Sequence, residues 1–357
     1  MQKMAVDVVI GGQRGDEGKG NFCLYLGLNG DYSIGLRSAS PQAGHSIHID
    51  GKRIGIAHLP CAAVNPKLRI LLGAASFISA KKLFYGGTEY RPHTKETIVL
   101  DAEIPTLGLT PDRLGIDNNA RLVTQDHAER EKKDERLMKL GSIGSGVNMA
   151  KLDLVYKIQK LAKEDPELAK YSVDTIKEMD EALSLGKNIL FETDHGVELC
   201  QHFGGYFPHN TARTINTSAY LGEVGLPPQS VRDIYLVVKP YITAVAKDAP
   251  LKNEIFDKST LEELLHAGGE SGSISGRIRR VGKFDEESFK RAIILSGATK
   301  IAISHLDLSK NAWNNVGFPN DIKFLDYLNS ICSQTRQKPT ISLVSYGPES
   351  KDIKEVL

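Results

Sequence analysis

The segment AVDVVIGGQRGDEGKGN, residues 5–21, joins an apolar run to a loop that carries glycines, an Asp, a Glu and a Lys. Val6 to Ile10 form a short β-branched run, as in a buried parallel strand, and Phe22 to Leu26 follow a helical pattern. Glycines let the backbone approach an anion closely, and the N–H groups at a helix start add positive partial charge. The order of strand, loop and helix therefore predicts a phosphate-binding loop. A glycine-rich turn without a ligand is the alternative.

This loop departs from the Walker A pattern G-x-x-x-x-G-K-[ST] at two places. Five residues instead of four separate Gly12 from Gly18, and Lys19 is followed by Gly20 instead of Ser or Thr. The missing hydroxyl normally helps to hold Mg²⁺. If the loop binds a nucleoside triphosphate, the metal needs another ligand, and Asp16 is the candidate.

His45 is the second residue that could do chemistry. In SPQAGHSIHI it follows the small residues Ala43 and Gly44 and precedes an alternating run. A histidine at such a strand edge could act as a general acid toward an oxygen that develops negative charge. An ordinary structural histidine is the alternative. His48 lies three residues on, so strand geometry turns it to the other face and excludes a metal-binding pair.

Arg277 and Arg279 form the third candidate. They flank Ile278 in SGSISGRIRRVGKFD, so an extended backbone would point both side chains to one face, where they could clamp a carboxylate. Ser273 and Ser275 could add hydroxyl donors. A run that binds nucleic acid is the weaker alternative, because 45 Lys and Arg balance 44 Asp and Glu and no aromatic residues lie between the arginines.

Asp307 follows a predicted strand that ends at His305 in ISHLDLSKN. A carboxylate at this position suits the ring N–H and amino donors of a purine base edge. A cap on the following helix explains the same residue equally well.

These residues need elements that bring them together. Strand-type runs between helical patterns predict an α/β fold with a large, mostly parallel sheet covered by helices on both faces. The predicted strands are Val6 to Ile10, Ile70 to Leu72, Asn188 to Phe191, Ile234 to Val238, Ile301 to Ile303 and Thr340 to Val344. Charged helices are predicted at His127 to Met138, Leu152 to Lys163 and Thr175 to Leu185.

Glycine-rich and polar clusters fall mostly after these strands. They lie at residues 12–20, 141–146, 193–196, 268–276 and 346–348. Ligands of an open parallel sheet bind at the carboxyl ends of its strands, so these clusters predict one composite site. Because no repeat, low-complexity tract or linker interrupts the chain, residues 1–357 are expected to form a single domain.

The bulk composition gives no reason to expect a nucleic-acid or membrane partner. The formal net charge is +1, and no apolar run approaches the roughly 20 residues of a membrane helix. The start MQKMAVDVVI leads into the first strand without a secretion signal. Four scattered cysteines favour buried thiols in a reducing compartment, so a cytoplasmic location is expected.

Six ordered motifs resemble those of the adenylosuccinate synthetase family. They are GDEGKG at 15–20, QAGHS at 42–46, LGSIGSG at 140–146, SISGRIRR at 273–280, HLD at 305–307 and SYGP at 345–348. The resemblance extends over nearly the whole chain, and six ordered motifs are far more specific than any one of them.

The resemblance implies a two-step ligation. The γ-phosphate of a nucleoside triphosphate would move to O6 of a 6-oxopurine nucleotide, and the amine of aspartate would then displace phosphate at C6. By position, Asp16 would remove the N1 proton and bind Mg²⁺, His45 would stabilise charge at O6, and Lys19 would neutralise the phosphate. The carbonyl of Gly44 would join the Mg²⁺ shell. The implied partners are small molecules, dGMP or IMP, ATP or GTP, and L-aspartate, and the implied assembly is a homodimer.

The same resemblance assigns the remaining site residues. Those for the nucleoside triphosphate are Gln13, Gly15, Glu17, Gly18, Gly20, Asp307, Ser345 and Gly347. Those for the purine monophosphate are Ser40, Gln42, Ser142, Ile143, His195 and Thr211. Those for aspartate are Ser273, Ile274, Ser275, Arg277 and Arg279.

Departures from the family pattern gather around the two purine bases. Pro41 precedes the AGH turn, Ser142 and Ile143 replace two threonines, and His195 replaces a glutamine. Pro41 makes the chain similar to phage enzymes of 2-aminoadenine synthesis, which accept dGMP instead of IMP and are associated with ATP or dATP as donor. This resemblance would place the chain in the host cytoplasm. The alternatives are an adenylosuccinate synthetase that uses IMP and GTP, and a nucleotide-binding regulatory protein without turnover.

The 2-amino group distinguishes dGMP from IMP and needs a hydrogen-bond acceptor near C2. Gln42 or the backbone of Ser38 to Ser40 is predicted to supply it, and Ile143 suits a place where the 2'-hydroxyl is missing.

Overall fold

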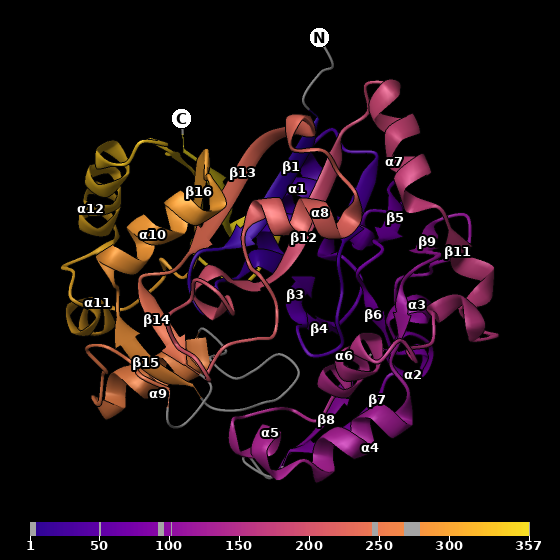
Figure 1. Ribbon diagram of the computed structural model, residues 1–357. Coiled ribbons are helices and arrows are strands. Elements are labelled where there is room, and N and C mark those ends of the chain that lie inside the picture. The colour runs from indigo at the N-terminus through magenta and orange to yellow at the C-terminus, as the bar shows by residue number, and fades with distance from the viewer. Residues whose placement is uncertain are drawn as a thin grey trace.

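The computed structural model describes residues 5–49, 51–91, 96–100, 102–244, 249–267 and 279–356. A ten-stranded sheet forms its centre (Figure 1). Its strands are β1 (Val6–Gly11), β2 (Ile34–Arg37), β5 (Arg69–Leu72), β9 (Leu114–Asp117), β11 (Ser172–Val173), β12 (Ile189–Gly196), β13 (Val231–Val238), β16 (Lys300–Ile303), β17 (Thr340–Ser345) and β18 (Ile353–Glu355). Their order is β11-β9-β5-β2-β12-β1-β13-β16-β17-β18.

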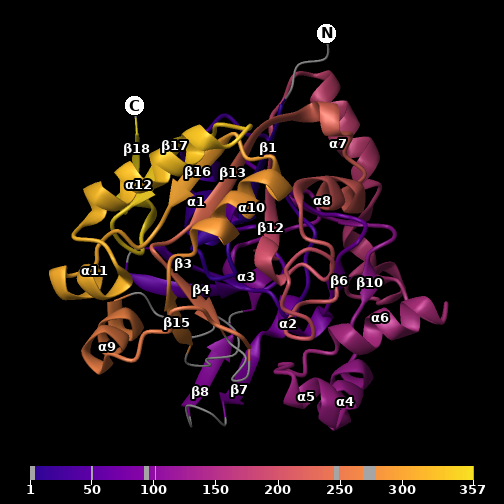
Figure 2. The same ribbon diagram turned by 60° about the vertical axis from the view of Figure 1, so that its left-hand side comes forward.

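Neighbouring strands of this sheet run parallel except at one edge, where β18 pairs antiparallel with β17. Figure 2 shows β16, β17 and β18 at that edge, with α12 (Asp321–Gln334) beside them. The predicted strands all belong to the sheet, and the mostly parallel α/β architecture is confirmed.

The remaining described elements cover and extend the sheet. The other α-helices are α1 (Lys19–Asn29), α2 (Ala80–Tyr85), α3 (Glu103–Thr106), α4 (Gln125–Lys133), α5 (Glu135–Lys139), α6 (Val147–Val155), α7 (Thr175–Ser184), α8 (Thr217–Val224), α9 (Lys258–Ala267), α10 (Glu286–Ser296) and α11 (Lys310–Val316). Two-stranded sheets pair β3 (His45–Ile49) with β4 (Lys52–Ile56), β6 (Phe77–Ile78) with β10 (Arg121–Leu122), β7 (Gly87–Arg91) with β8 (Glu96–Leu100), and β14 (Tyr241–Ala244) with β15 (Arg280–Lys283).

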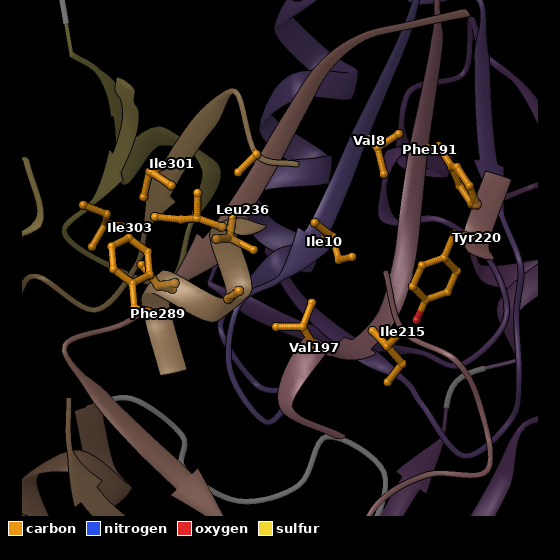
Figure 3. Packing of buried hydrophobic residues seen from close by; sticks show 14 of the residues in the cluster. Val8, Ile10, Phe191, Val197, Ile215, Tyr220, Leu236, Phe289, Ile301 and Ile303 are labelled. Carbon is orange, nitrogen blue, oxygen red and sulfur yellow. The ribbon is translucent and has the colours of Figure 1, made fainter. Parts of the chain in front are cut away.

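Both faces of the central sheet are buried. Successive side chains of a strand point to opposite faces. In β1, Val8 and Ile10 therefore join a core cluster that includes residues of α7, α8, α10, α11 and α12, whereas Val9 joins a second cluster that includes residues of α1. Figure 3 shows Val8 and Ile10 on the first side, near Phe191 and Tyr220. Helices on both faces explain why β1 is apolar at nearly every position.

One predicted helix is interrupted. The charged stretch 127–138 was expected to be continuous, but α4 ends at Lys133 and α5 begins at Glu135. Between them Asp134 has extended backbone, and its carboxylate accepts the N–H of Leu137 at 2.9 Å. The local hydrogen bond of an Asp cap has therefore outweighed helix continuity.

A second predicted helix, at 152–163, is wrong over most of its length. α6 ends at Val155, because Lys157 adopts the left-handed conformation with φ of 63°. The helix expected at 175–185 is confirmed as α7.

The glycine-rich and polar clusters only partly follow strands. Residues 12–20 and 346–348 do lie beyond the carboxyl ends of β1 and β17. Residues 193–196 still belong to β12, and residues 141–146 connect α5 to α6. The cluster at 268–276 lies outside the described residues.

Two further sequence expectations concern the whole chain. The four cysteines, Cys23, Cys61, Cys200 and Cys332, are buried and unpaired, as predicted. Among the described helices, none combines the length and the apolar character that a membrane crossing requires.

The buried face of α1 should dominate how that helix stabilises the sheet. Leu24 is 1% exposed and Leu28 is 45% exposed on the same helix. We expect Leu24→Ala to lower the free energy of unfolding by about 2–5 kcal/mol through the cavity that it leaves. Leu28→Ala should stay within about 0.5 kcal/mol of the unchanged protein. Urea denaturation measures both, and equal effects would contradict this packing.

Candidate active site

The loop after β1 is organised by the carboxylate of Glu17. It accepts the backbone N–H groups of Gln13 at 3.0 Å and Gly15 at 2.9 Å, and it pairs with the ammonium of Lys19 at 2.6 Å. Glu17 is fully buried, and a Cβ on Gly11 would come within 2.6 Å of its carboxylate. Glu17 therefore shapes the loop from inside, which gives it a structural role that the sequence did not reveal.

Gln13, also predicted to bind the triphosphate, turns away from the cavity. Its amide donates to the carbonyls of Lys239 at 3.0 Å and Tyr241 at 3.2 Å, and it accepts the N–H of Lys239 at 3.2 Å. The side chain thus ties the loop to the turn between β13 and β14.

Asp16 projects from this loop in a conformation that is rare for a residue with a side chain. Its φ is 62°, in the left-handed region. Its carboxylate pairs with the guanidinium of Arg279, which is buried just before β15. Burial lowers the pKa of Arg279, so an anionic partner is needed to keep this cation stable there.

A cavity of about 750 Å³ gathers the predicted catalytic residues. Asp16, Lys19, Gly44, His45 and Arg279 all line it. A carboxylate and a backbone carbonyl are hard oxygen ligands of the kind that Mg²⁺ prefers. Asp16 and Gly44 therefore fit the predicted metal site.

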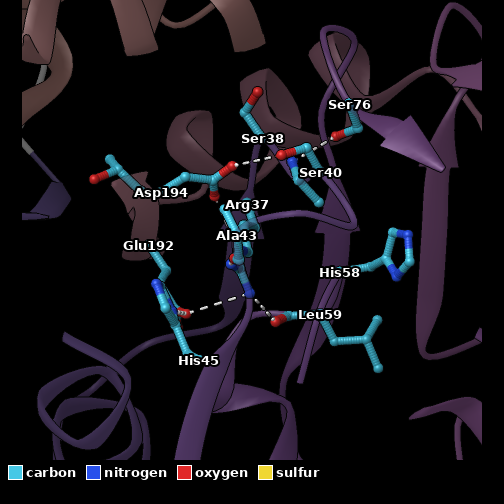
Figure 4. A network of polar contacts seen from close by, with 12 residues as sticks. Arg37, Ser38, Ser40, Ala43, His45, His58, Leu59, Ser76, Glu192 and Asp194 are labelled. Atoms are coloured by element: carbon cyan, nitrogen blue, oxygen red, sulfur yellow. Dashed lines mark hydrogen bonds and ion pairs between the residues drawn. The ribbon is translucent and has the colours of Figure 1, made fainter. Parts of the chain in front are cut away.

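The imidazole of His45 is held by Glu192 of β12. Nδ1 of His45 contacts Oε1 of Glu192 (Figure 4). Oε2 of Glu192 accepts the N–H of Cys61 at 2.7 Å. Arg37 lies 3.6 Å from Oε1. Arg37, the last residue of β2, and Glu192, within β12, are directly paired in the register of the two strands, so opposite charges lie side by side on adjacent strands.

This contact determines which proton His45 carries. Burial, followed by the charge of Arg37, lowers the pKa of His45, whereas Glu192 raises it. Burial opposes ionisation of Glu192, but His45 and Arg37 hold its pKa below the ordinary value. Glu192 is thus a carboxylate that accepts Nδ1–H, and Nε2 of His45 becomes a donor only when a second proton binds.

The space behind the loop explains why Gly20 follows Lys19. A Cβ at position 20 would lie 2.9 Å from Sγ of Cys61 and 3.0 Å from Cβ of His45. The Ser or Thr of a Walker A loop does not fit here, because His45 and Cys61 occupy its place. Gly20 in place of Ser or Thr after Lys19 is therefore a consequence of packing.

The cavity lined by the predicted catalytic residues is called the catalytic cavity below. His195 lies where it meets a smaller cavity. It lines both cavities, and its backbone φ is 56°. Its Nδ1 is buried without a hydrogen-bond partner in the described structure. Burial lowers the pKa of His195 to about 3, and Arg213, Lys151 and Lys19 act in the same direction. The ring is therefore neutral at physiological pH.

A buried network of ion pairs supports this wall. Arg213 donates to Asp194 at 2.8 Å, to Oγ of Ser38 at 2.6 Å and to Glu223. Asp194 also pairs with Arg37 at 3.3 Å. The network connects Asp194 near the end of β12 to the end of β2 and to α8, and it holds the residue that precedes His195.

The other residues predicted for the purine monophosphate divide between the two cavities. Ser142, Ile143 and Thr211 line the catalytic cavity, Ser40 lines the smaller one, and Gln42 lines both. The hydroxyl of Ser142 donates to Glu131 and accepts the N–H of Gly144 at 3.1 Å.

The residues predicted for the donor base lie apart from these cavities, at the carboxyl ends of β16 and β17. Asp307 is exposed, and Ser309, not Asp307, caps α11. The hydroxyl of Ser345 donates to the carbonyl of Gly347 at 2.8 Å.

Two contacts join this region to the loop after β1. The hydroxyl of Ser304 donates to the carbonyl of Glu17 at 2.8 Å, and Asn21 donates to the carbonyl of Pro348 at 2.5 Å. A donor base beside Asp307 would therefore lie next to the start of α1. Gly18, with φ of 81°, sits against Ser304.

Part of the predicted aspartate clamp lies outside the described residues. These positions are Ser273, Ile274, Ser275 and Arg277. Arg279 is the described member of that set.

Sequence reasoning missed several residues of the site. Glu192, Arg37, Asp194 and Arg213 were not singled out, although Glu192 directly follows the predicted strand that ends at Phe191 and Arg37 is the last residue of β2. A charged residue at the end of a buried parallel strand can be identified as a site candidate from the sequence, because its charge must either reach a ligand or meet a counter-charge. Arg213 offers no such signal.

The packing of Gly20 gives a stability test. We expect Gly20→Ala to lower the free energy of unfolding by about 1–3 kcal/mol, because the new methyl group overlaps Cys61 and His45. A methyl group added to Gly222 of α8 would meet no other part of the described structure within 4 Å, so Gly222→Ala is the matched control. It should raise stability by up to about 1 kcal/mol through helix propensity. Chemical denaturation compares the two, and a gain in both would refute the overlap.

Comparison with known proteins agrees with the motif order. The Adenylosuccinate synthetase family model matches residues 8–157 and 147–314. The adenylosuccinate synthetase of Thermococcus onnurineus is 32% identical over 351 residues, which cover 97% of each chain. That of Methanocaldococcus jannaschii is 32% identical over 347 residues, or 96% of this chain and 94% of the relative.

Solved structures show the same fold. The fully ligated adenylosuccinate synthetase of Plasmodium falciparum has a TM-score of 0.82 at 19% identity, covering 99% of this chain and 100% of that one. The succinoaminodeoxyadenylate synthetase of cyanophage S-2L, bound to dGMP and dATP, has a TM-score of 0.77 at 20% identity, covering 99% and 95%. From the family match and the similarity over almost its full length, this chain belongs to the adenylosuccinate synthetase family.

Proposed function

We propose that the chain phosphorylates O6 of dGMP with ATP and then joins L-aspartate at C6. The products are N6-succino-2-amino-2'-deoxyadenylate, ADP and phosphate, for the synthesis of 2-aminoadenine. One observation carries the reaction: a single cavity gathers Asp16, Lys19, Gly44, His45 and Arg279 from segments far apart in the chain. These are the groups that phosphoryl transfer and carboxylate binding require.

In the first step, O6 of the purine bonds to the γ-phosphorus while the bond from that phosphorus to the bridging oxygen of ADP breaks. Asp16 accepts the proton from N1. Lys19 neutralises charge on the phosphoryl group, and His45, protonated on Nε2, donates to the oxygen at C6. Mg²⁺ bound by Asp16 and the Gly44 carbonyl would add charge neutralisation on the phosphates.

In the second step, the amine of aspartate attacks C6, the new C–N bond forms, and phosphate leaves with the O6 oxygen. Arg279 would bind a carboxylate of the incoming aspartate. Its guanidinium pairs with Asp16 in the structure. Binding of aspartate would exchange one carboxylate partner of Arg279 for another, which leaves the carboxylate of Asp16 available to the purine.

The proposal of dGMP rests on the wall around the purine. Ile143 lines the catalytic cavity with an apolar side chain where the family motif has a threonine. The backbone carbonyls of Ser38, Ala39 and Ser40 already accept hydrogen bonds from Arg213, Phe77 and Ala43. Gln42, which lines both cavities, is therefore the better of the two predicted acceptors for the 2-amino group.

We extend the proposal to the assembly and location of the enzyme. Residues 1–357 would act as one adenylosuccinate-synthetase-like domain in a homodimer. The four unpaired, buried cysteines support a reducing cytoplasm, that of the host if the chain is phage-encoded.

The test of substrate identity is phosphate release with Mg²⁺ and L-aspartate, with IMP, GMP and dGMP each combined with ATP and GTP. Product masses should be recorded in the same reactions. We expect turnover of dGMP with ATP. Turnover of IMP alone would replace dGMP by the ordinary adenine nucleotide route, and turnover of no purine with bound nucleotide would favour a regulatory protein.

The role of Asp16 can be tested by Asp16→Asn. We expect kcat to fall by about a hundredfold to ten-thousandfold, the usual contribution of a general base, while nucleotide affinity stays largely intact. Asp31→Asn changes an exposed acid near the end of α1 and is the control. Unchanged phosphate release by Asp16→Asn would exclude Asp16 as the base.

The role of Glu192 as a positioning residue can be tested by a pH profile. Glu192 raises the pKa of His45, so Glu192→Gln should lower it further. Since the protonated imidazole is the proposed donor, the loss of kcat at high pH should begin at a lower pH in the variant. Glu178→Gln, which removes a partner of Arg69 far from the cavity, serves as the control. A Glu192→Gln profile that changes only in height would argue against this coupling.

A further inference from the structure

A second cavity, of about 380 Å³, opens beside the catalytic one, and no step of the proposed reaction uses it. The two cavities share Gln42, His195, Gln201 and Ala212 in their walls. Lys151 of α6 and Arg213 supply positive charge to the side cavity. A ligand in the catalytic cavity can therefore extend past His195 toward these two cations.

Arg213 and Lys151 differ in whether carboxylates pair with their positive charge. The guanidinium of Arg213 is paired with the carboxylates of both Asp194 and Glu223. The ammonium of half-buried Lys151 donates to a neutral group, the carbonyl of Ala212, at 2.6 Å. An ammonium has three donors, so Lys151 retains donors for an anion.

A purine monophosphate needs such a cation. Of the residues predicted to bind it, Ser40, Gln42, Ser142, Ile143 and Thr211 have no charge, and His195 is neutral at physiological pH. The cations of the catalytic cavity are engaged elsewhere: Lys19 is proposed for the γ-phosphate and Arg279 for aspartate, and Arg14 pairs with Glu198. Among the described residues that line this cavity, the phosphate dianion would otherwise have only the exposed Arg136 at the rim.

We propose that Lys151 binds the phosphate of the purine monophosphate, in the side cavity next to Gln42. The assignment rests on the proposed function, since the reacting C6 end of the purine must face Asp16 and His45. The sugar and phosphate then extend away from those residues, toward Ala212 and Lys151. Lys151 thereby supplies a cation from within the same chain.

The environment of Lys151 makes this binding depend on pH. Burial, then Arg213, lowers the pKa of Lys151 to about 8, and the charges of Glu223, Asp194 and Glu131 partly offset this. These groups face the ammonium from α8, β12 and α4. Without a ligand, Lys151 therefore loses its charge as the pH rises through about 8, and a bound dianion raises its pKa again. Affinity for the monophosphate should fall between pH 7.5 and 9.5.

Calorimetry can measure this without turnover, by titrating dGMP and IMP, and separately deoxyguanosine and inosine, into the full chain. We expect Lys151→Met to weaken binding of the monophosphates by about tenfold or more, the size of a charge-assisted hydrogen bond. Binding of the nucleosides should change less than about twofold. Lys151→Arg should retain monophosphate affinity and keep it up to pH 9.5, because a guanidinium stays charged. Lys163→Met, which removes an exposed charge, is the matched control.

The outcomes separate this proposal from the function on which it rests. Equal monophosphate affinity in Lys151→Met and the unchanged chain would overturn the role of Lys151 while leaving the ligase proposal intact. Loss of monophosphate affinity in Arg136→Met but not in Lys151→Met would assign phosphate binding to Arg136. That result would equally overturn the role of Lys151. Failure of the unchanged chain to bind any purine monophosphate would refute the proposed function and the assignment together. If Lys151→Met does not fold, monophosphate affinity is instead measured from pH 7.5 to 9.5 for Lys151→Arg and for the unchanged chain. The same pH dependence in both proteins would overturn the role of Lys151.

Discussion

The carboxylate of Glu192 is the interaction on which the catalytic arrangement depends. It lies in the middle of β12, directly beside Arg37 at the end of β2, and it reaches both the imidazole of His45 and the backbone of Cys61. A buried carboxylate is stable only where charge and hydrogen bonds compensate for lost water. Arg37, His45 and Cys61 must therefore stay in register with it. The parallel pairing of β2 with β12 thus fixes the position of His45, the proposed catalytic side chain, which neither strand contains.

The site as a whole is built from charges that neutralise one another before any ligand arrives. Glu17 with Lys19, Asp16 with Arg279, and Asp194 with Arg213 are pairs in which one or both partners are buried. Such pairs contribute little net stability, because desolvation offsets most of the Coulomb attraction. Their value lies in preorganisation: the polar groups are already held in a water-poor cavity, where a substrate that replaces one partner meets the other at full strength.

Sequence patterns predicted β1, β5, β12, β13, β16 and β17 because these strands are largely buried and read as apolar runs, whereas the short edge strands β11 and β18 are half-buried or exposed and give no such pattern. They predicted Asp16, Lys19, His45 and Arg279 for one site because each stands in a short motif, and the structure places these four side chains on one cavity. The helix break at Asp134 and the early end of α6 were missed, since both depend on single backbone hydrogen bonds or one left-handed residue. Arg213 and Lys151 were missed for a different reason. Their surroundings come from distant segments, and neither stands in a recognisable motif.

The crowding behind Gly20 has a consequence for how this loop can change over time. A chain that regained a hydroxyl after the loop lysine would first need a smaller side chain at Cys61 and a displaced His45. Either change alone would disturb the proposed site around His45 and Cys61 without supplying the hydroxyl that binds Mg²⁺ in a Walker A loop. The loop after β1 and a Walker A loop are thus separated by an intermediate in which the packing around position 20 is disturbed. The packing at position 20 therefore couples any larger side chain there to changes at both Cys61 and His45.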